Sequence, residues 1–167
     1  LLTHGPHTTT PMNKANAPEG KPALYAGNVT YMDHLVGKLV AAVDELGLKE
    51  RTLIVFTGDN GSASSGTLNG EPYPKGKGRQ ADWGAHVPFI VRAPFLSRGG
   101  IISRDLIDFT DLYPTFLDLA GVTPPKTLKL DGKSFVPSLR GDEDPFKKRS
   151  WIYSQIGDFR MIRDWYH

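Results

Sequence analysis

A long amphipathic segment followed by a short apolar run most constrains how this chain can fold. Between residues 24 and 46, apolar residues recur at alternating steps of four and three, the spacing of one helix face. These positions are Tyr25, Val29, Met32, Val36, Leu39, Val43 and Leu46. Gly47 is placed to end the helix. Residues 52–57 (TLIVFT) are typical of a strand buried on both faces of a sheet. A helix followed by a buried strand predicts an α/β fold with a mostly parallel sheet.

Weaker patterns predict further strands and loops. Apolar runs at 87–91 and 101–107 predict two strands, and WIYSQ at 151–155 predicts another. Residues 122–150 have the composition of a loop. The glycine-rich stretch 58–84 is too long for a simple connection, and loops of that length inside a compact domain are usually functional.

A second helix is predicted after residue 107. Asp108 or Thr110 can cap its beginning, and Gly121 is placed to end it. Its predicted apolar face consists of Leu112, Phe116 and Leu119.

The composition excludes several classes of protein. The 167 residues, 39% apolar and 23% charged, have the size and balance of one ordinary globular domain. A net charge of +2 is too small for a protein that grips nucleic acid through net charge. No apolar run approaches the ~18–20 residues of a membrane span. The absence of cysteine excludes a cysteine nucleophile within these residues. Because the chain begins with neither Met nor a signal-peptide pattern, we expect it to be cut from a longer one.

The segment that follows the strand at 52–57 is the first candidate site. Ligands bind at this edge of open α/β sheets. Asp59 offers a carboxylate and Asn60 an amide oxygen, and adjacent hard oxygen donors suit Ca²⁺ or Mg²⁺. The alternative is a plain turn, because Asp-Asn-Gly is common turn chemistry.

The run Lys75-Gly76-Lys77-Gly78-Arg79 is the second candidate site. Three cations in five residues suit a phosphate or sulfate group, and the glycines let a ligand approach closely. Its spacing is not that of a phosphate-binding Walker loop. The alternative is a solvated loop with flexible lysines.

Histidines form the third candidate. His4 and His7 follow a possible strand, and either can act as a general acid or base or as a metal ligand. His34 lies beside the apolar stripe of the first helix and is predicted to be a surface residue.

Taken together, these segments resemble the formylglycine-dependent sulfatases (arylsulfatase family) of the alkaline phosphatase superfamily. The resemblance covers most of residues 1–160. It rests on LTHGP at 2–6, YMDHLVGKLVAAVDELGL at 31–48, TLIVFTGDNGS at 52–62, KGKGRQADWGAHVPFIVRAP at 75–94 and DFTDLYPTFLDLAGV at 108–122. Each motif alone is weak, whereas all of them in the family's order are specific. The resemblance implies an alkaline phosphatase-like three-layer α/β sandwich, in which a mostly parallel sheet is flanked by helices. It also implies that residues 1–167 form the second half of a sulfatase catalytic domain, incomplete at both ends.

The resemblance implies roles for individual residues. Asp59 and Asn60 match the pair that ligates a calcium ion in this family. His4, in a His-x-Pro arrangement, matches the histidine that contacts the sulfate ester and protonates the leaving oxygen. Lys77 matches the lysine that binds the sulfate, and Lys75 is the alternative.

The chain also departs from the family's pattern. Asp82-Trp83-Gly84 stands where the family has Glu-Gly-Gly, and His86 stands where Arg is common, so the roles of Asp82 and His86 stay open and the substrate pocket is expected to differ. The nucleophile motif Cys/Ser-x-Pro-x-Arg, whose first residue becomes formylglycine, has no match here, nor do the upstream Asp-Asp calcium ligands. We therefore expect both upstream, and no turnover by these residues alone.

The predicted function is calcium-dependent hydrolysis of sulfate monoesters, aryl or carbohydrate. One alternative is a phosphatase or phosphodiesterase of the same superfamily, but those enzymes tend to place Asp-His where this chain has Asp59-Asn60. Another is a catalytically dead module that binds sulfated glycans. The predicted partner is a small-molecule or glycan sulfate ester, with no nucleic acid and no membrane span, and the predicted location is periplasmic or extracellular. The particular ester and the oligomeric state stay open.

Overall fold

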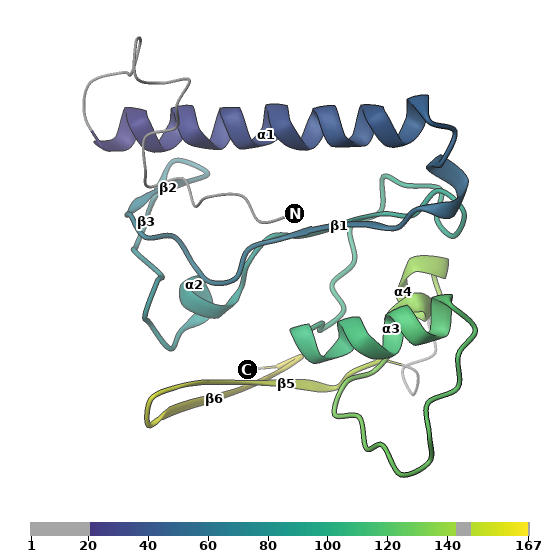
Figure 1. Cartoon of the computed structure of the whole chain (residues 1–167). Helices are drawn as coiled ribbons and strands as arrows, with labels where there is room; N and C mark the ends of the chain where they lie inside the picture. The colour runs from purple at the N-terminus through teal and green to yellow at the C-terminus, as the bar shows by residue number, and fades with distance from the viewer. Residues whose placement is uncertain (1–20, 143–147, 167) are drawn as a thin grey trace. The chain divides into compact units, whose positions relative to one another are not determined.

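The computed structural model describes residues 21–142 and 148–166 and divides the chain into two compact units (Figure 1). The first unit takes in the chain up to Thr52 together with Thr57–Phe89. The second takes in Leu53–Phe56 and the chain from Ile90 onward. Each unit mixes helices and strands.

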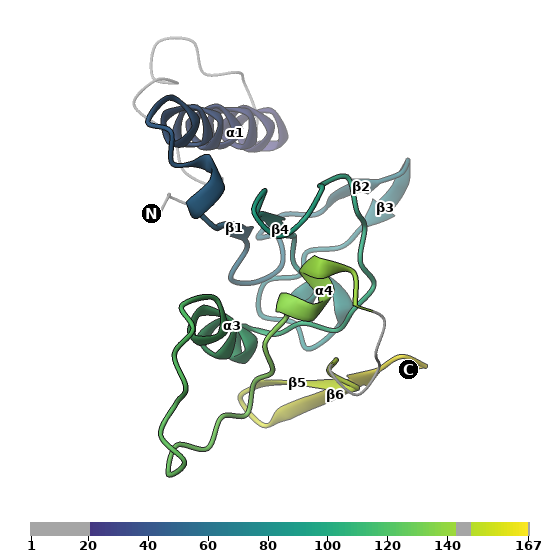
Figure 2. The ribbon, with the colours of Figure 1, turned by 90° about the vertical axis from the view of Figure 1, so that its right-hand side faces the viewer.

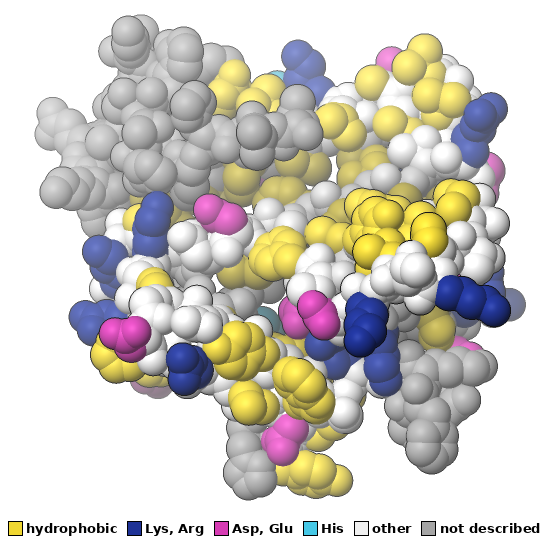
Figure 3. Space-filling model, turned by 60° about the horizontal axis from the view of Figure 1, so that its bottom comes forward, with side chains coloured by type: hydrophobic (Ala, Val, Ile, Leu, Met, Phe, Trp, Pro, Cys, Tyr) yellow, Lys and Arg dark blue, Asp and Glu magenta, His cyan; other side chains and the backbone are white. Residues whose placement is uncertain are grey.

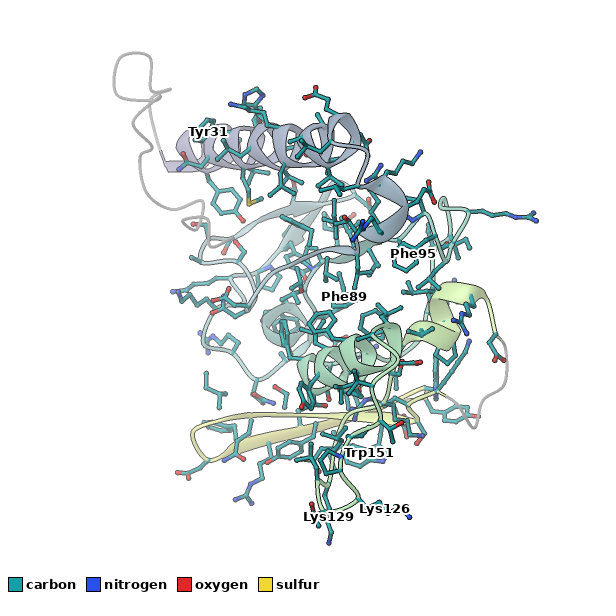
Figure 4. The ribbon with its side chains drawn as sticks, turned by 45° about the vertical axis from the view of Figure 1, so that its right-hand side comes forward. Tyr31, Phe89, Phe95, Lys126, Lys129 and Trp151 are labelled. Atoms are coloured by element: carbon teal, nitrogen blue, oxygen red, sulfur yellow. The ribbon has the colours of Figure 1, made fainter. Side chains whose placement is uncertain are left out.

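The first unit begins with the long helix that the sequence predicts. Helix α1 spans Lys21–Glu45, and Gly47 follows it with a left-handed φ of +67°, as a helix-ending glycine does. His34 is exposed, as predicted, and its ring stacks on that of Tyr31, with the centroids 6.5 Å apart (Figure 4). A short 3-10 helix, η2 (Lys49–Arg51), then leads into the first strand.

Strand β1 (Ile54–Thr57) pairs with β4 (Phe89–Arg92) in a two-stranded sheet. Both strands are predicted by the sequence, with small shifts of their bounds. The expected burial of β1 on both faces is wrong, because all four residues are only half-buried. Within the described residues β1 has a single neighbouring strand, so it is the edge of a small sheet rather than the centre of a large one.

The glycine-rich stretch between β1 and β4 contains structure that the sequence reading missed. Strands β2 (Gly66–Leu68) and β3 (Glu71–Tyr73) form an antiparallel hairpin. Its turn is Asn69-Gly70, with φ of 53° and 86°, and Asn-Gly is the pair that favours such two-residue turns. Helix α2 (Asp82–Ala85) is one turn long and precedes β4.

The second unit contains the second predicted helix. It opens as η3 (Phe109–Asp111) and continues as α3 (Leu112–Leu119). Asp108 is the cap, in a reciprocal capping box with Asp111. The predicted apolar face is partly wrong, because Phe116 is 48% exposed whereas Thr115 is fully buried. The Thr115 hydroxyl donates to Asp111 O at 2.6 Å and accepts from Phe135 N–H at 3.0 Å, so hydrogen bonds make its burial possible.

The rest of the second unit differs from the sequence expectations in two places. The strand predicted at 101–107 does not form; a single antiparallel bridge, Leu106 to Arg149, is all the pairing found there. The loop predicted at 122–150 contains a short helix, α4 (Val136–Arg140). The apolar composition of residues 101–107 is therefore not enough to form a strand, because only Leu106 has a pairing partner.

The chain then forms an antiparallel hairpin of β5 (Trp151–Ile156) and β6 (Phe159–Asp164). The strand predicted at 151–155 is confirmed as β5, whereas β6 was missed. Both ribbon views show α3 and α4 on the same side of this hairpin (Figures 1 and 2).

Few apolar side chains are buried. Ala93, Phe135 and Val136 are the buried hydrophobic residues of the described ranges. Many large hydrophobic side chains are exposed, and Figure 3 shows them gathered at the surface among Lys and Arg. No helix within 21–142 or 148–166 has the length and apolar character needed to cross a membrane.

Candidate functional site

The loop after β1 presents the predicted metal ligands. Asp59 and Asn60 are both exposed, two and three residues beyond the last residue of β1. The Asn60 amide Nδ2 donates to Asp59 Oδ1 at 2.9 Å and to the carbonyl of Gly61 at 3.4 Å. The two side chains therefore lie together at the end of a strand, as the sequence predicts.

Gly61 packs its backbone directly against α2. Its N–H donates to Gly84 O at 2.9 Å. A Cβ added at Gly61 would lie 1.9 Å from the carbonyl oxygen of Trp83, closer than any side-chain carbon can approach. Only glycine therefore fits at the position that follows Asn60.

The basic run is fastened to the same loop. The carbonyl oxygen of Ser62 accepts from the N–H groups of Gly76 and Lys77, each at 3.0 Å. A Cβ added at Gly76 would lie 1.7 Å from Trp83 O, so Gly76 is also in backbone contact with α2. The side chains of Lys75 and Lys77 are exposed. The structure thus brings the basic run beside the loop of Asp59 and Asn60, which the sequence could suggest only through resemblance.

The main chain of Arg79 also packs against helix α2, in addition to Gly61 and Gly76. A Cβ on Gly84 would lie 2.0 Å from Arg79 O, and Gly84 N–H donates to Ala81 O at 2.8 Å. His86 N–H closes the turn by donating to Asp82 O at 2.7 Å. The Asp82 side chain is half-buried and that of His86 is exposed. Asp82 is the first residue of α2, and His86 directly follows the helix.

A contact from α1 supports the site and was missed by the sequence reading. The hydroxyl groups of Tyr25 and Ser62 lie 3.3 Å apart. The Ser62 hydroxyl also donates to Ser64 O at 2.7 Å and accepts from Ser64 N–H at 3.1 Å. Tyr25 matched the apolar helical pattern, and nothing in that pattern indicated a polar partner 37 residues away.

The donor set fits a hard cation only in part. Asp59 and Asn60 supply carboxylate and amide oxygens, which are the ligands that Ca²⁺ prefers. A calcium ion takes about six to eight oxygen ligands, so this pair is a fraction of a complete site. No group of three or more His, Asp or Glu side chains suited to hold a metal occurs in the described part of the chain. His4 and His7 lie outside the described residues.

A buried ion pair organises the second unit. The Asp111 side chain is 2% exposed, and Arg149 contacts both of its oxygens, with Nη2 2.5 Å from Oδ1 and Nε 3.1 Å from Oδ2. Lys133 N–H adds a hydrogen bond to Oδ1 at 2.7 Å. The hydrogen bond to Asp111 raises the pKa of the Arg149 guanidinium above its usual value, against the opposing effect of burial. This cluster is saturated with internal partners and is structural.

Asp105 lies beside the same cluster. Its carboxylate is 3.1 Å from Lys148 Nζ. Burial pushes the pKa of Asp105 up, but hydrogen bonds from Ser138, Lys148 and Ser103 and the charge of Lys148 outweigh it. The pKa of the Asp105 carboxyl therefore lies below its ordinary value.

Comparisons with known proteins all point to the same family. A family model described as Sulfatase matches residues 1–122. The chain is 35% identical to steryl-sulfatase of Mus musculus over 131 residues, 71% of this chain and 20% of that protein. It is 34% identical to arylsulfatase D of Homo sapiens over 153 residues, 86% of this chain and 25% of that protein. The chain thus spans about a fifth to a quarter of these relatives' length.

Solved structures give the same result. The PsFucS1 sulfatase from Pseudoalteromonas sp. superposes with a TM-score of 0.70 at 30% identity, covering 92% of this chain and 31% of that one. Ps i-CgsB in complex with k-i-k-neocarrahexaose superposes with a TM-score of 0.76 at 31% identity, covering 96% and 37%. These likenesses confirm the predicted fold class, an alkaline phosphatase-like α/β sandwich present as a partial domain.

Proposed function

This chain belongs to the sulfatase family, and from that premise we propose that the complete protein hydrolyses sulfate monoesters, aryl or carbohydrate. The observation that carries the proposal is a backbone hydrogen bond between the two candidate loops. The carbonyl of Ser62, which lies two residues after Asn60, accepts from the N–H of Lys77. We propose further that residues 1–167 are the second half of the catalytic domain. The chain covers 20% and 25% of two of its relatives, as a piece of a longer protein would.

Lys77 supplies positive charge for the substrate in this proposal. A sulfate monoester is an anion, and its nonbridging oxygens gain negative charge as an oxygen nucleophile attacks. The main chain of Lys77 is hydrogen-bonded to Ser62, so its ammonium group extends from a fixed base. Lys75, two residues earlier and also exposed, is the alternative cation.

Asp59 and Asn60 are the residues that would hold a calcium ion. Both residues are exposed and adjacent at the end of β1, with the Asn60 amide group hydrogen-bonded to Asp59 Oδ1, which suits ligation together with donors from elsewhere in the complete protein. Such an ion, when bound, would polarise the sulfate oxygens as a Lewis acid.

His4 is proposed to protonate the leaving oxygen, a role typically worth ~10²- to 10⁴-fold in rate. The nucleophile is proposed to be a formylglycine upstream of these residues. These residues alone are therefore expected to show no turnover. We propose a periplasmic or extracellular location, by analogy with the family.

The test uses the complete protein with its formylglycine in place, assayed with 4-nitrophenyl sulfate and 4-nitrophenyl phosphate. We expect sulfate hydrolysis, and a loss of roughly 10²-fold or more in kcat/KM for Asp59→Ala and for Lys77→Ala. Lys75→Ala tests the alternative lysine. Lys126→Ala, an exposed lysine in the loop after α3 (Figure 4), is the matched control and should keep wild-type rates. A preference for the phosphate ester, or unchanged rates in both site variants, would contradict the proposal.

A further inference from the structure

We propose that Tyr25 is a positioning residue of the candidate site, which sets the place of the basic run by donating a hydrogen bond from helix α1 to Ser62. The inference rests on the proposed function and deepens it, because it concerns how the proposed sulfate lysine is held. Tyr25 lies in the second turn of α1, 37 residues before Ser62, so the contact joins two separate segments of the first unit.

The hydrogen bonds of the Ser62 hydroxyl determine the direction of this contact. A serine hydroxyl has one proton to donate and two lone pairs that accept. The Ser62 proton goes to Ser64 O, which at 2.7 Å is nearer than the Tyr25 oxygen at 3.3 Å. One lone pair accepts from Ser64 N–H at 3.1 Å. The other lone pair is therefore the acceptor for the Tyr25 hydroxyl, which completes the hydrogen bonding of Ser62.

The main chain of Ser62 is the other half of the connection. Its carbonyl oxygen accepts from Gly76 N–H and from Lys77 N–H, each at 3.0 Å. Lys75 N–H donates to the Ser65 hydroxyl at 3.2 Å. Three consecutive N–H groups of the basic run thus donate to the same short loop, so the place of that loop sets the place from which the lysine side chains extend.

Contacts with two helices fix the place of the loop. The bonds between Ser62 and Ser64 are local, so they hold the shape of the loop but not its position. Tyr25 ties it to α1, and on the other side Gly61 N–H donates to Gly84 O at 2.9 Å, in α2. Loss of the Tyr25 bond should therefore shift the basic run rather than release it.

Steady-state kinetics of the complete protein measure this effect. Tyr25→Phe removes one hydroxyl and keeps the ring. We expect KM for 4-nitrophenyl sulfate and the inhibition constant of inorganic sulfate to rise together about fivefold, equivalent to the ~1 kcal/mol of one hydrogen bond. Tyr31→Phe makes the same change on the same helix (Figure 4) and is the matched control. It should leave both constants unchanged, because the ring stays available to stack on His34.

Two double variants separate positioning from a general structural role. Lys77→Ala removes the ammonium group that Tyr25 is proposed to place, so adding Tyr25→Phe should raise neither constant further. Ser62→Ala removes the hydroxyl that accepts from Tyr25, so Tyr25→Phe should add nothing in that background either. A merely structural contribution would add its full effect in both backgrounds, as independent sites do.

The remaining outcomes are distinct. A wild-type inhibition constant of inorganic sulfate in an active Tyr25→Phe protein overturns this inference and leaves the proposed function standing. Full additivity with Lys77→Ala also overturns it, because Tyr25 then acts through another part of the molecule. A wild-type protein that hydrolyses no sulfate ester overturns the proposed function and the inference with it.

Discussion

The main-chain N–H of Lys77 donates a hydrogen bond to the carbonyl oxygen of Ser62, with a nitrogen-to-oxygen distance of 3.0 Å. Gly76 N–H donates to the same oxygen at the same distance, so one carbonyl holds two consecutive residues of the basic run. Ser62 in turn lies two residues after Asn60. The proposed sulfate lysine and the proposed metal ligands are therefore parts of one backbone assembly, and a change that opens the assembly should affect both.

Substituting Gly76 by Ala tests that assembly. The new Cβ would lie 1.7 Å from Trp83 O, so the loop must move away from α2. Steric insertions of this kind typically cost about 1–3 kcal/mol of stability. We expect Gly76→Ala to lower both the melting temperature and kcat/KM of the complete protein, measured by thermal unfolding and with 4-nitrophenyl sulfate.

The matched control is Gly66→Ala at the start of β2. No atom lies within 4 Å of a Cβ placed there, and its φ is not positive, so the added methyl meets neither a clash nor backbone strain. Gly66→Ala should leave both quantities near wild type. Equal effects of the two substitutions would show that the contact with Trp83 does not matter.

Local signals in the sequence account for the parts of the fold that were predicted. The 3.6-residue periodicity and Gly47 specify α1, and Asp108 specifies the start of the second helix, because helix faces and caps depend on residues within one or two turns. The hairpin at Asn69-Gly70 carried an equally local turn signal, and was missed because the surrounding stretch was read as a loop.

Long-range contacts account for what could not be predicted. Trp83 O meets Gly61 and Gly76 backbone to backbone, and such contacts leave no periodic pattern in a sequence. Thr115 is buried because Phe135 N–H, 20 residues away, satisfies its hydroxyl. At the candidate site the sequence alone indicated donor types at Asp59, Asn60 and Lys77, and their assembly into one place needed the structure.

Calcium should stabilise the complete protein through Asp59 and Asn60. A ligand that binds only the folded state adds RT ln(1 + [L]/Kd), or about 2.7 kcal/mol at a hundredfold excess over Kd. We expect chelation to lower the melting temperature and added calcium to restore it, in differential scanning fluorimetry. Asp59→Ala should abolish most of this response.

The control for the calcium response is Asp158→Ala, an exposed carboxylate in the turn between β5 and β6. That variant should keep the wild-type dependence on calcium. If Asp59→Ala kept the full calcium-dependent shift in melting temperature, Asp59 would not be a calcium ligand.

Removing Arg149 should destabilise the second unit strongly. Asp111 is 2% exposed, and Arg149 is its cationic partner at 2.5 Å. Breaking a buried pair by deleting one partner typically costs about 3–5 kcal/mol, because the remaining charge stays buried. We expect Arg149→Ala to lower the free energy of unfolding by that amount in urea, and Arg149→Lys to recover only part of it, since lysine cannot contact both carboxylate oxygens as a planar fork does. Arg160→Ala, on an exposed residue of β6, should stay within about 0.5 kcal/mol of wild type.

Asp105 should make stability depend on acid pH. Its pKa in the folded protein lies below the usual value of about 3.9, because hydrogen bonds from Ser138, Lys148 and Ser103 outweigh the effect of burial. A depressed folded pKa contributes stability that is fully present above the unfolded pKa and is lost as pH falls through the folded pKa. The stability difference between wild type and Asp105→Asn should therefore be constant above about pH 5 and should shrink below pH 4 in thermal unfolding series. Asp158→Asn serves as the exposed control, and a difference that grew on acidification would contradict the assignment.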